Sequence, residues 1–270
     1  MTDKAETETE DKMPLLEHLV ELRTRLMYAA GGFLAAFLVC FYFANPMFDF
    51  LVEPLAGIWE GEADRRMIYT ALHEKFFTNI KVAFFAAAFI SFPIIAGQIW
   101  MFVAPGLYKN EKSAFLPFLI ATPLLFLMGA SLVYYFVMPV AWQFFASFQS
   151  LGAEGALPIE LLPKVGEYLS LVMRLIFAFG ISFELPVLMT LLARVGIVNS
   201  EGLKKKRRYA IVAAFAAAAI LTPPDPLSQI SLAIPIILLY EISIISARMI
   251  EKKREKQNAE EDAEKVTSII

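Results

Sequence analysis

Long apolar stretches without a single charged side chain restrict how this chain can fold more than any other feature. Residues 26–43, 82–103 and 114–142 contain no Asp, Glu, Lys or Arg. Even the shortest stretch, at about 1.5 Å per residue, reaches about 27 Å, close to the roughly 30 Å of hydrocarbon in a bilayer. Hydrophobic residues make up 58% of the chain, well above the usual share in a water-soluble protein. The sequence therefore predicts an all-α polytopic membrane protein.

Three more apolar segments bring the predicted number of transmembrane helices to six. Residues 168–193 form a long one that carries Arg174 and Glu184, and residues 209–221 and 230–245 form two shorter ones. A TPPDP sequence separates the last two, and its three prolines exclude a continuous helix. Prolines inside other spans are expected to kink them and to favour a cupped bundle. The expected spans cover residues 24–43, 77–103, 113–142, 166–194, 208–222 and 228–246.

The fifth and sixth spans are short for a bilayer. Their apolar cores would reach about 20 Å and about 24 Å, below the usual hydrocarbon thickness. Two interpretations remain open: the bilayer thins beside them, or flanking residues and neighbouring helices cover the deficit.

Basic residues predict the orientation, because Lys and Arg are retained on the cytoplasmic side. With a cytoplasmic N-terminus, 18 of the 24 basic residues lie inside. We therefore expect a disordered cytoplasmic leader over residues 1–13, a single membrane domain over residues 14–248, and a charged, partly helical cytoplasmic tail over residues 249–270. The outer loops would be residues 44–76, 143–165 and 223–227. The first of them contains an amphipathic stretch, expected to form a helix on the membrane surface.

Several classes of function are disfavoured by composition. Cys40 is the only cysteine, so an intramolecular disulfide is impossible and a thiolate metal site is not expected. The two histidines, His18 and His73, fall on opposite sides of the membrane in this topology, which argues against an enzyme. We expect no cofactor and no nucleic acid. A proton-coupled secondary transporter of small solutes stays open as an alternative, because Arg174 and Glu184 lie within a span.

The segment HLVELRTRL leads into the first span as an amphipathic helix, and Glu21 lies one turn before Arg25. By themselves, Arg23 and Arg25 can be explained as anchors on the cytoplasmic side. Glu21 and Arg25 can likewise be explained as an ordinary solvated pair.

Four separated motifs, in order, resemble the TatC family: HLVELRTRL, QIWMFVAPGLYKNEK, AFGISFELPV and LTPPDPLSQ. The resemblance spans roughly residues 14–248. It implies the core receptor of the twin-arginine translocase in the bacterial cytoplasmic (inner) membrane. Such a receptor binds twin-arginine signal peptides of folded proteins and assembles, in several copies, with the single-span subunits TatA and TatB. Export would then use the proton-motive force.

The resemblance also implies the residues that would bind a signal peptide. Glu21 and Glu111 match the acidic positions of the family, and two adjacent guanidinium groups call for more than one carboxylate. The residues expected beside them are His18, Arg23, Arg25 and Phe102. For Phe102, lipid contact or core packing is the alternative.

Two polar sites are expected elsewhere. Glu184 lies near the middle of the fourth span, where an ionised carboxylate is costly, so we expect it to be protonated or reached by water. The alternative is a neutral Glu184 that hydrogen-bonds a neighbouring helix. Partner helices would dock at the turn between spans five and six, through Thr222, Pro223, Asp225 and Gln229. Helix capping is the alternative for Asp225.

Overall fold

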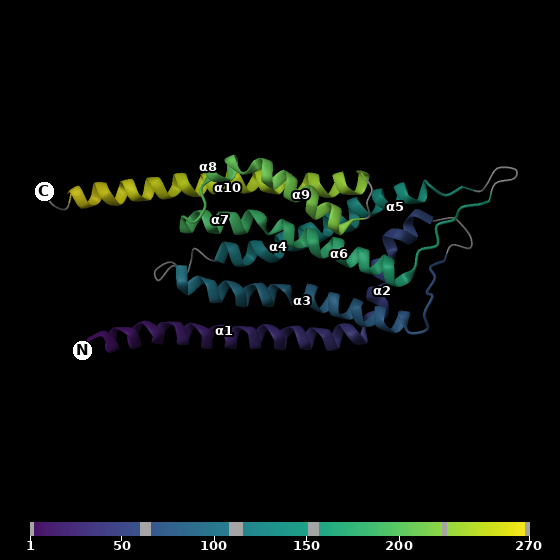
Figure 1. Cartoon of the computed structure of the whole chain (residues 1–270), viewed down its shortest axis with the longest axis horizontal. Coiled ribbons are helices and arrows are strands. Elements are labelled where there is room, and N and C mark those ends of the chain that lie inside the picture. The colour runs from purple at the N-terminus through teal and green to yellow at the C-terminus, as the bar shows by residue number, and fades with distance from the viewer. Residues whose placement is uncertain (1–2, 60–65, 108–115, 151–156, 223–225, 268–270) are drawn as a thin grey trace. The chain divides into compact units, whose positions relative to one another are not determined.

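The computed structural model describes residues 3–59, 66–107, 116–150, 157–222 and 226–267, and most of them are helical (Figure 1). Within these residues the β-type pairings are two isolated bridges, Ile68 with Lys164 and Ser150 with Ile159. The predicted all-α class is therefore confirmed.

Five helical stretches are long and apolar enough to cross a membrane. They are Leu16–Tyr42, Glu74–Phe102, Pro117–Ala146, Val165–Arg194 and Gln229–Lys253. The segment expected as a short fifth span forms α9, Arg207–Leu221, which has 15 residues. Its length of about 22 Å is short of a full bilayer crossing. The structure thus supports a multi-pass protein with five long helices, and the sixth span remains a prediction.

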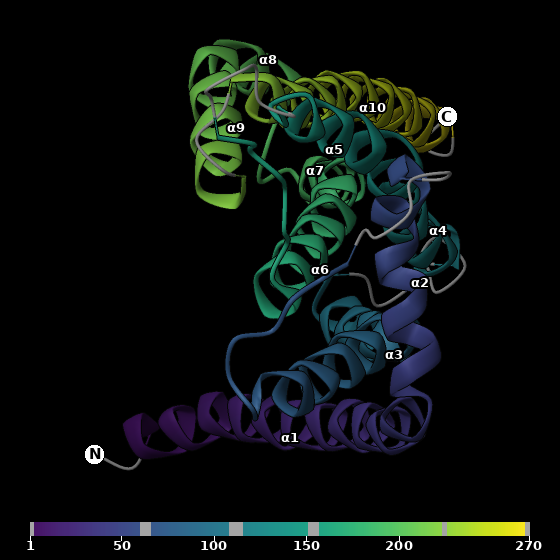
Figure 2. The same cartoon turned by 90° about the vertical axis from the view of Figure 1, so that its right-hand side faces the viewer.

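The chain divides into two compact units, which we describe separately. Unit 1 contains residues 1–48 and 79–123. In it α1, Asp3–Tyr42, lies along α3, Glu74–Leu107 (Figures 1 and 2). Small buried residues from both helices and from the start of α2, Ala44–Ala56, make the contact: Cys40, Ala44, Ala83 and Ala87. Phe33 and Phe37 pack against this cluster, so small residues allow the helices to approach and aromatic rings fill the rest.

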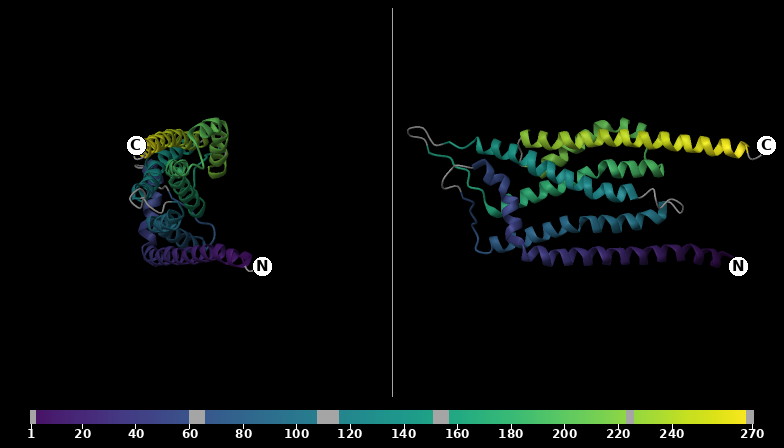
Figure 3. Two further views of the ribbon diagram at one scale, coloured as in Figure 1. Left: turned by 90° about the vertical axis from the view of Figure 1, so that its left-hand side faces the viewer. Right: turned by 180° about the vertical axis from the view of Figure 1, so that it is seen from behind.

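Unit 2 contains residues 49–78 and 124–270. Its longest helix, α10, Pro226–Thr267, packs mainly on α7, Leu185–Val195, and on α9 (Figures 1 and 3). The short α8, Ser200–Lys205, is tied to α10 because the Ser200 amide and hydroxyl both donate to the Glu251 carboxylate. The end of α4, Leu116–Leu132, meets α6, Val165–Phe183, at two glycines. A Cβ on Gly180 would lie 2.5 Å from the Phe126 ring, and one on Gly129 would lie 2.7 Å from the Phe179 carbonyl.

A network of hydrogen bonds joins three segments of unit 2 around the start of α6. The Glu74 carboxylate accepts from the backbone amides of Thr70, Ala71 and Gly166, at 2.9, 3.4 and 3.0 Å. The Ile68 amide donates to Pro163, and the Val165 amide donates back to Ile68. The Tyr168 hydroxyl donates to the Leu51 carbonyl at 3.1 Å. These bonds hold residues 66–74, the middle of α2 and the start of α6 in one arrangement.

Two predicted spans are interrupted where proline removes a backbone donor. The third span changes to a π-helix over Val133–Val137 before α5, Met138–Ala146, which has Pro139 at its start. The fourth span is divided into α6 and α7 at Glu184, just before Pro186. Proline cannot donate to the preceding turn, so the helix widens or breaks at these points.

The two tails and the first outer loop also contain helix. α1 begins at Asp3, so the described part of the predicted disordered leader is helical. Its Ala, Glu and Lys residues are strong helix formers, and acidic residues near the N-terminus complement the helix dipole. α10 continues through the charged tail to Thr267. The expected loop helix corresponds to α2 and the 3₁₀ helix Gly57–Trp59.

Candidate functional site

The candidate site in unit 1 is a cluster of side chains between the N-terminal half of α1 and the C-terminal half of α3, which we call the α1–α3 cluster. It consists of His18, Glu21, Arg25, Gln98 and Phe102. On α1, residues 18, 21 and 25 are three and four positions apart, so they share one helix face. On α3, residues 98 and 102 are four apart for the same reason. The helices thus present two short polar and aromatic rows to each other.

Arg25 is at the centre of the cluster. Its guanidinium lies 3.3 Å from a Glu21 carboxylate oxygen and 3.5 Å from the Gln98 side-chain oxygen. It also lies 3.5 Å from the sulfur of Met101. These are long contacts, and about 30% of the Arg25 and Glu21 side chains is exposed. The pair is therefore held weakly and stays accessible from outside the protein.

An aromatic contact closes one end of the cluster. The rings of His18 and Phe102 are stacked, with centroids 4.3 Å apart and planes 12° apart. His18 is exposed and Phe102 is half-buried. Phe102 thus packs against a residue of the predicted site, a contact different from the lipid or core packing considered above.

The remaining residues predicted for this site are placed as follows. Arg23 is exposed on α1, two residues from both Glu21 and Arg25. Glu111 lies outside the described residues. The structure therefore brings together His18, Glu21, Arg25 and Phe102, while the expected pairing of Glu21 with Glu111 stays a prediction.

Gln98 and Met101 were missed as candidate residues. Both belong to the QIWMF part of the motif that carried the family resemblance. Gln98 lies four residues before Phe102 and three before Met101, so it shares a helix face with each of them. Helical spacing from Phe102 would have identified Gln98, and spacing from Gln98 would then have identified Met101.

The other predicted polar residues lie in unit 2. Glu184 is half-buried at the junction of α6 and α7. Thr222 is buried, and its hydroxyl donates to the Ala218 carbonyl at 2.9 Å. The Gln229 amide donates to the Phe215 carbonyl at 3.2 Å, which links the start of α10 to α9. Pro223 and Asp225 lie outside the described residues.

The chemistry available in these clusters is recognition by charge and shape. Among the described residues, no group of three or more His, Cys, Asp or Glu side chains is placed to hold a metal ion. The α1–α3 cluster instead offers a carboxylate that already binds a guanidinium, beside an amide and an aromatic face. Such a set suits a ligand with arginine side chains.

Comparisons with known proteins agree with the resemblance in the sequence. The family model for Sec-independent protein translocase protein (TatC) matches residues 17–235. A TatC protein of Magnetococcus marinus is 54% identical over 257 residues, covering 95% of this chain and 92% of its relative. The TatC protein of Escherichia coli K12 is 41% identical over 239 residues, covering 88% and 90%.

A solved structure is also similar to this fold. A crystal structure of the twin-arginine translocase receptor TatC superposes with a TM-score of 0.74 at 37% identity, covering 87% of this chain and 99% of that one. Because sequence and fold agree over most of both chains, this chain belongs to the TatC family of Sec-independent protein translocase proteins.

Proposed function

We propose that the chain is the receptor subunit that binds twin-arginine signal peptides of folded proteins at the cytoplasmic face of the bacterial inner membrane. The observation that carries this proposal is the contact between the Arg25 guanidinium and the Glu21 carboxylate at 3.3 Å. This contact supports the idea that Glu21 can bind a guanidinium at this position. An incoming arginine would take over the carboxylate, and Glu111 would receive the second arginine of the pair.

The neighbouring residues have defined parts in this proposal. Gln98 provides a neutral oxygen for Arg25 once Glu21 is occupied by the ligand. The stacked rings of His18 and Phe102 supply an apolar wall for the residue that follows the two arginines. Arg23 and Arg25 repel a cationic peptide that lacks an acceptor for each of its charges.

Peptide binding to the purified protein in lipid nanodiscs tests this function. A fluorescent peptide with two consecutive arginines should bind, and replacing both with lysine should weaken binding about tenfold, because lysine lacks the planar fork. The double variant Glu21→Gln, Glu111→Gln should lose at least as much affinity. Glu17→Gln, which removes an exposed carboxylate one turn earlier on α1, is the matched control and should bind normally. Unchanged binding by the double variant would refute the proposal.

We further propose that TatA and TatB helices dock at the edge formed by Thr222, Pro223, Asp225 and Gln229. Support comes from the polar side chains of Thr222 and Gln229, which lie close to the α9–α10 connection inside an otherwise apolar region. Polar groups in such places stabilise contacts between membrane helices. After a signal peptide is bound, assembly at this edge would lead to export driven by the proton-motive force.

Co-purification with tagged TatA and TatB tests whether this edge binds partners or only stabilises the fold of the chain itself. Gln229→Leu should clearly reduce the amount of TatA and TatB recovered. It should change the unfolding temperature of the isolated protein only slightly. Thr190→Val is the control, because it removes a side-chain donor to a carbonyl in α7, away from the α9–α10 connection. Full recovery of both partners with Gln229→Leu would contradict the docking site.

The proposed topology has six spans, including the short α9, and both termini in the cytoplasm. The distribution of 18 of 24 basic residues supports it. In a Cys40→Ala background, a cysteine replacing Glu160 should react with an impermeant thiol reagent applied from the outside. A cysteine replacing Lys253 should react only after the membrane is opened.

A further inference from the structure

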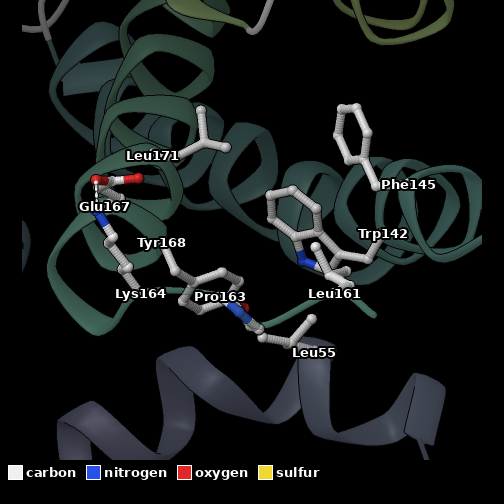
Figure 4. Close-up of a pocket in the computed structure, with 9 residues that line it drawn as sticks. All are labelled: Leu55, Trp142, Phe145, Leu161, Pro163, Lys164, Glu167, Tyr168 and Leu171. Carbon is white, nitrogen blue, oxygen red and sulfur yellow. Dashed lines mark hydrogen bonds and ion pairs between the residues drawn. The ribbon is translucent and has the colours of Figure 1, made fainter. Parts of the chain in front are cut away.

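A pocket of about 260 Å³ in unit 2 lies where two membrane-spanning helices end (Figure 4). One span ends at Ala146 and the next begins at Val165, so the pocket is at a membrane boundary whichever way the chain is oriented. Its walls are mostly apolar and come from four segments: Leu55, Trp142, Phe145, Leu161, Tyr168 and Leu171. Trp and Tyr are typical of this depth, where one side of a ring meets hydrocarbon and the other meets headgroups.

The charged groups of the pocket form one pair of opposite sign. The Lys164 ammonium lies 3.3 Å from a Glu167 carboxylate oxygen, and both side chains are solvent-exposed, 43% and 77%. Figure 4 shows this pair on one side of the pocket and Trp142 with Phe145 on the other. An exposed pair of this kind is weak, so a ligand that offers both charges can separate it at little cost.

Two aromatic residues add polar atoms inside the pocket. The Tyr168 hydroxyl donates to the Leu51 carbonyl, which fixes its ring. The indole N–H of Trp142 is buried and donates no hydrogen bond of regular geometry within the described residues, although it lies near the Tyr168 hydroxyl. The Trp142 and Tyr168 rings pack with centroids 5.5 Å apart, so together they form a fixed aromatic wall of the pocket.

We propose that this pocket binds a zwitterionic phospholipid with a primary ammonium headgroup, of the phosphatidylethanolamine type. Lys164 binds the phosphate, Glu167 accepts hydrogen bonds from the ammonium group, and the rings of Trp142 and Tyr168 border the glycerol region. The volume equals about nine water molecules at about 30 Å³ each, enough for the glycerol region and the first carbons of one chain. The rest of the lipid continues into the bilayer.

The charges of the pair set the selectivity among lipids. A glycerol headgroup places its phosphate on Lys164 but offers Glu167 only neutral hydroxyl groups in place of a cation. A choline headgroup carries the right net charge, but its quaternary ammonium has no N–H to donate to Glu167. Binding should therefore be strongest for the ethanolamine headgroup, by about tenfold over either of the other two, the effect of one charged hydrogen bond.

Native mass spectrometry of the full-length protein, with ethanolamine, glycerol and choline phospholipids of identical chains, tests the proposal. The double variant Lys164→Gln, Glu167→Gln should lose the preference for ethanolamine. The exchanged pair Lys164→Glu, Glu167→Lys keeps both charges and should retain most of it. Leu161→Trp should reduce binding of all three lipids by filling the pocket. None of these residues belongs to the proposed signal-peptide or partner sites, so peptide binding should stay intact.

The matched control is another exposed lysine–glutamate pair of unit 2, Lys205 with Glu201 at 2.9 Å. Neutralising it by Lys205→Gln and Glu201→Gln should leave the lipid preference unchanged. Equal retention of the three lipids by the wild type would overturn the proposal. The same loss in the control variant, or unchanged binding in Leu161→Trp, would also overturn it.

Discussion

α1 and α6 each contain an apolar stretch long enough to be part of a membrane span, yet the protein buries the two helices very differently. In the most apolar window of the span containing α6, 44% of residues are buried, compared with 6% for α1. α6 contacts neighbours through glycines, where backbone and ring come close together. α1 contacts α3 through a small-residue cluster at one end and the long polar contacts of the α1–α3 cluster at the other. The tightly packed helix thus provides the scaffold, and the loosely packed one carries the candidate binding residues.

The largest effect on stability is expected from adding a side-chain carbon at Gly180, where α6 packs closely against Phe126. A Cβ on Gly180 would lie 2.5 Å from the Phe126 ring, which is 1% exposed and cannot move aside. Gly180→Ala should lower the free energy of unfolding in micelles by about 2 to 3 kcal/mol. Gly31→Ala is the control, because a Cβ there meets nothing within 4 Å. If the two variants were equally stable, the contrast between α6 and α1 would be refuted.

A smaller effect is expected at the start of α6, where Glu74 accepts three backbone N–H groups. Glu74→Gln keeps the shape but removes the charge and replaces one acceptor with a donor. The free energy of unfolding should fall, by less than for Gly180→Ala, because three backbone amides lose their charged acceptor. Amide hydrogen exchange should rise in residues 66–74 and around Gly166. Glu160→Gln, at an exposed position, should change neither quantity.

On the α1 side, removing an aromatic ring should change binding more than stability. Phe102→Ala removes the stacking partner of His18, at a position that is only half-buried. We expect a loss of about 1 kcal/mol or less in the free energy of unfolding. Affinity for a twin-arginine peptide should fall about fivefold, corresponding to about 1 kcal/mol. A large loss of stability with normal peptide affinity would instead assign Phe102 to the core.

The smallest effect concerns Glu201, which is exposed on α8. A hydrogen bond from Lys205, together with its positive charge, lowers the pKa of the Glu201 carboxyl from 4.5. A lowered pKa means that this pair stabilises the fold above pH 4.5 and stops doing so as the pH falls through the lower value. Glu201→Gln should therefore leave the free energy of unfolding at neutral pH almost unchanged. It should reduce the loss of stability that occurs as the pH falls below 4.5. Unfolding curves at several pH values measure this.

The sequence predicted the helices well where one physical signal dominates. Charge-free runs predicted the regions where the structure has long apolar helices, because hydrocarbon excludes charge over a fixed length. It missed the π-helix at Val133–Val137 and the break at Glu184. Prolines near both places predicted a distortion of the helix. A helix that lacks one backbone donor can kink, widen or break, and the proline alone does not select among these.

The candidate site was only partly predictable. Helical spacing places His18, Glu21 and Arg25 on one face of α1. Their partners on α3 are more than 70 residues away along the chain, and the meeting of Arg25 with Gln98 depends on how two helices pack. The Glu74 network was missed for the same reason, since its key acceptor contact reaches Gly166, 92 residues later.

A double-mutant cycle between the protein and its ligand tests the central claim most directly. Peptide affinity would be measured for wild type and Glu21→Gln, each with the twin-arginine peptide and with peptides in which one arginine is replaced by glutamine. We predict a coupling free energy of about 1.5 to 3 kcal/mol between Glu21 and one of the two arginines. Strictly additive effects for both arginines, within about 0.3 kcal/mol, would show that Glu21 does not contact the ligand.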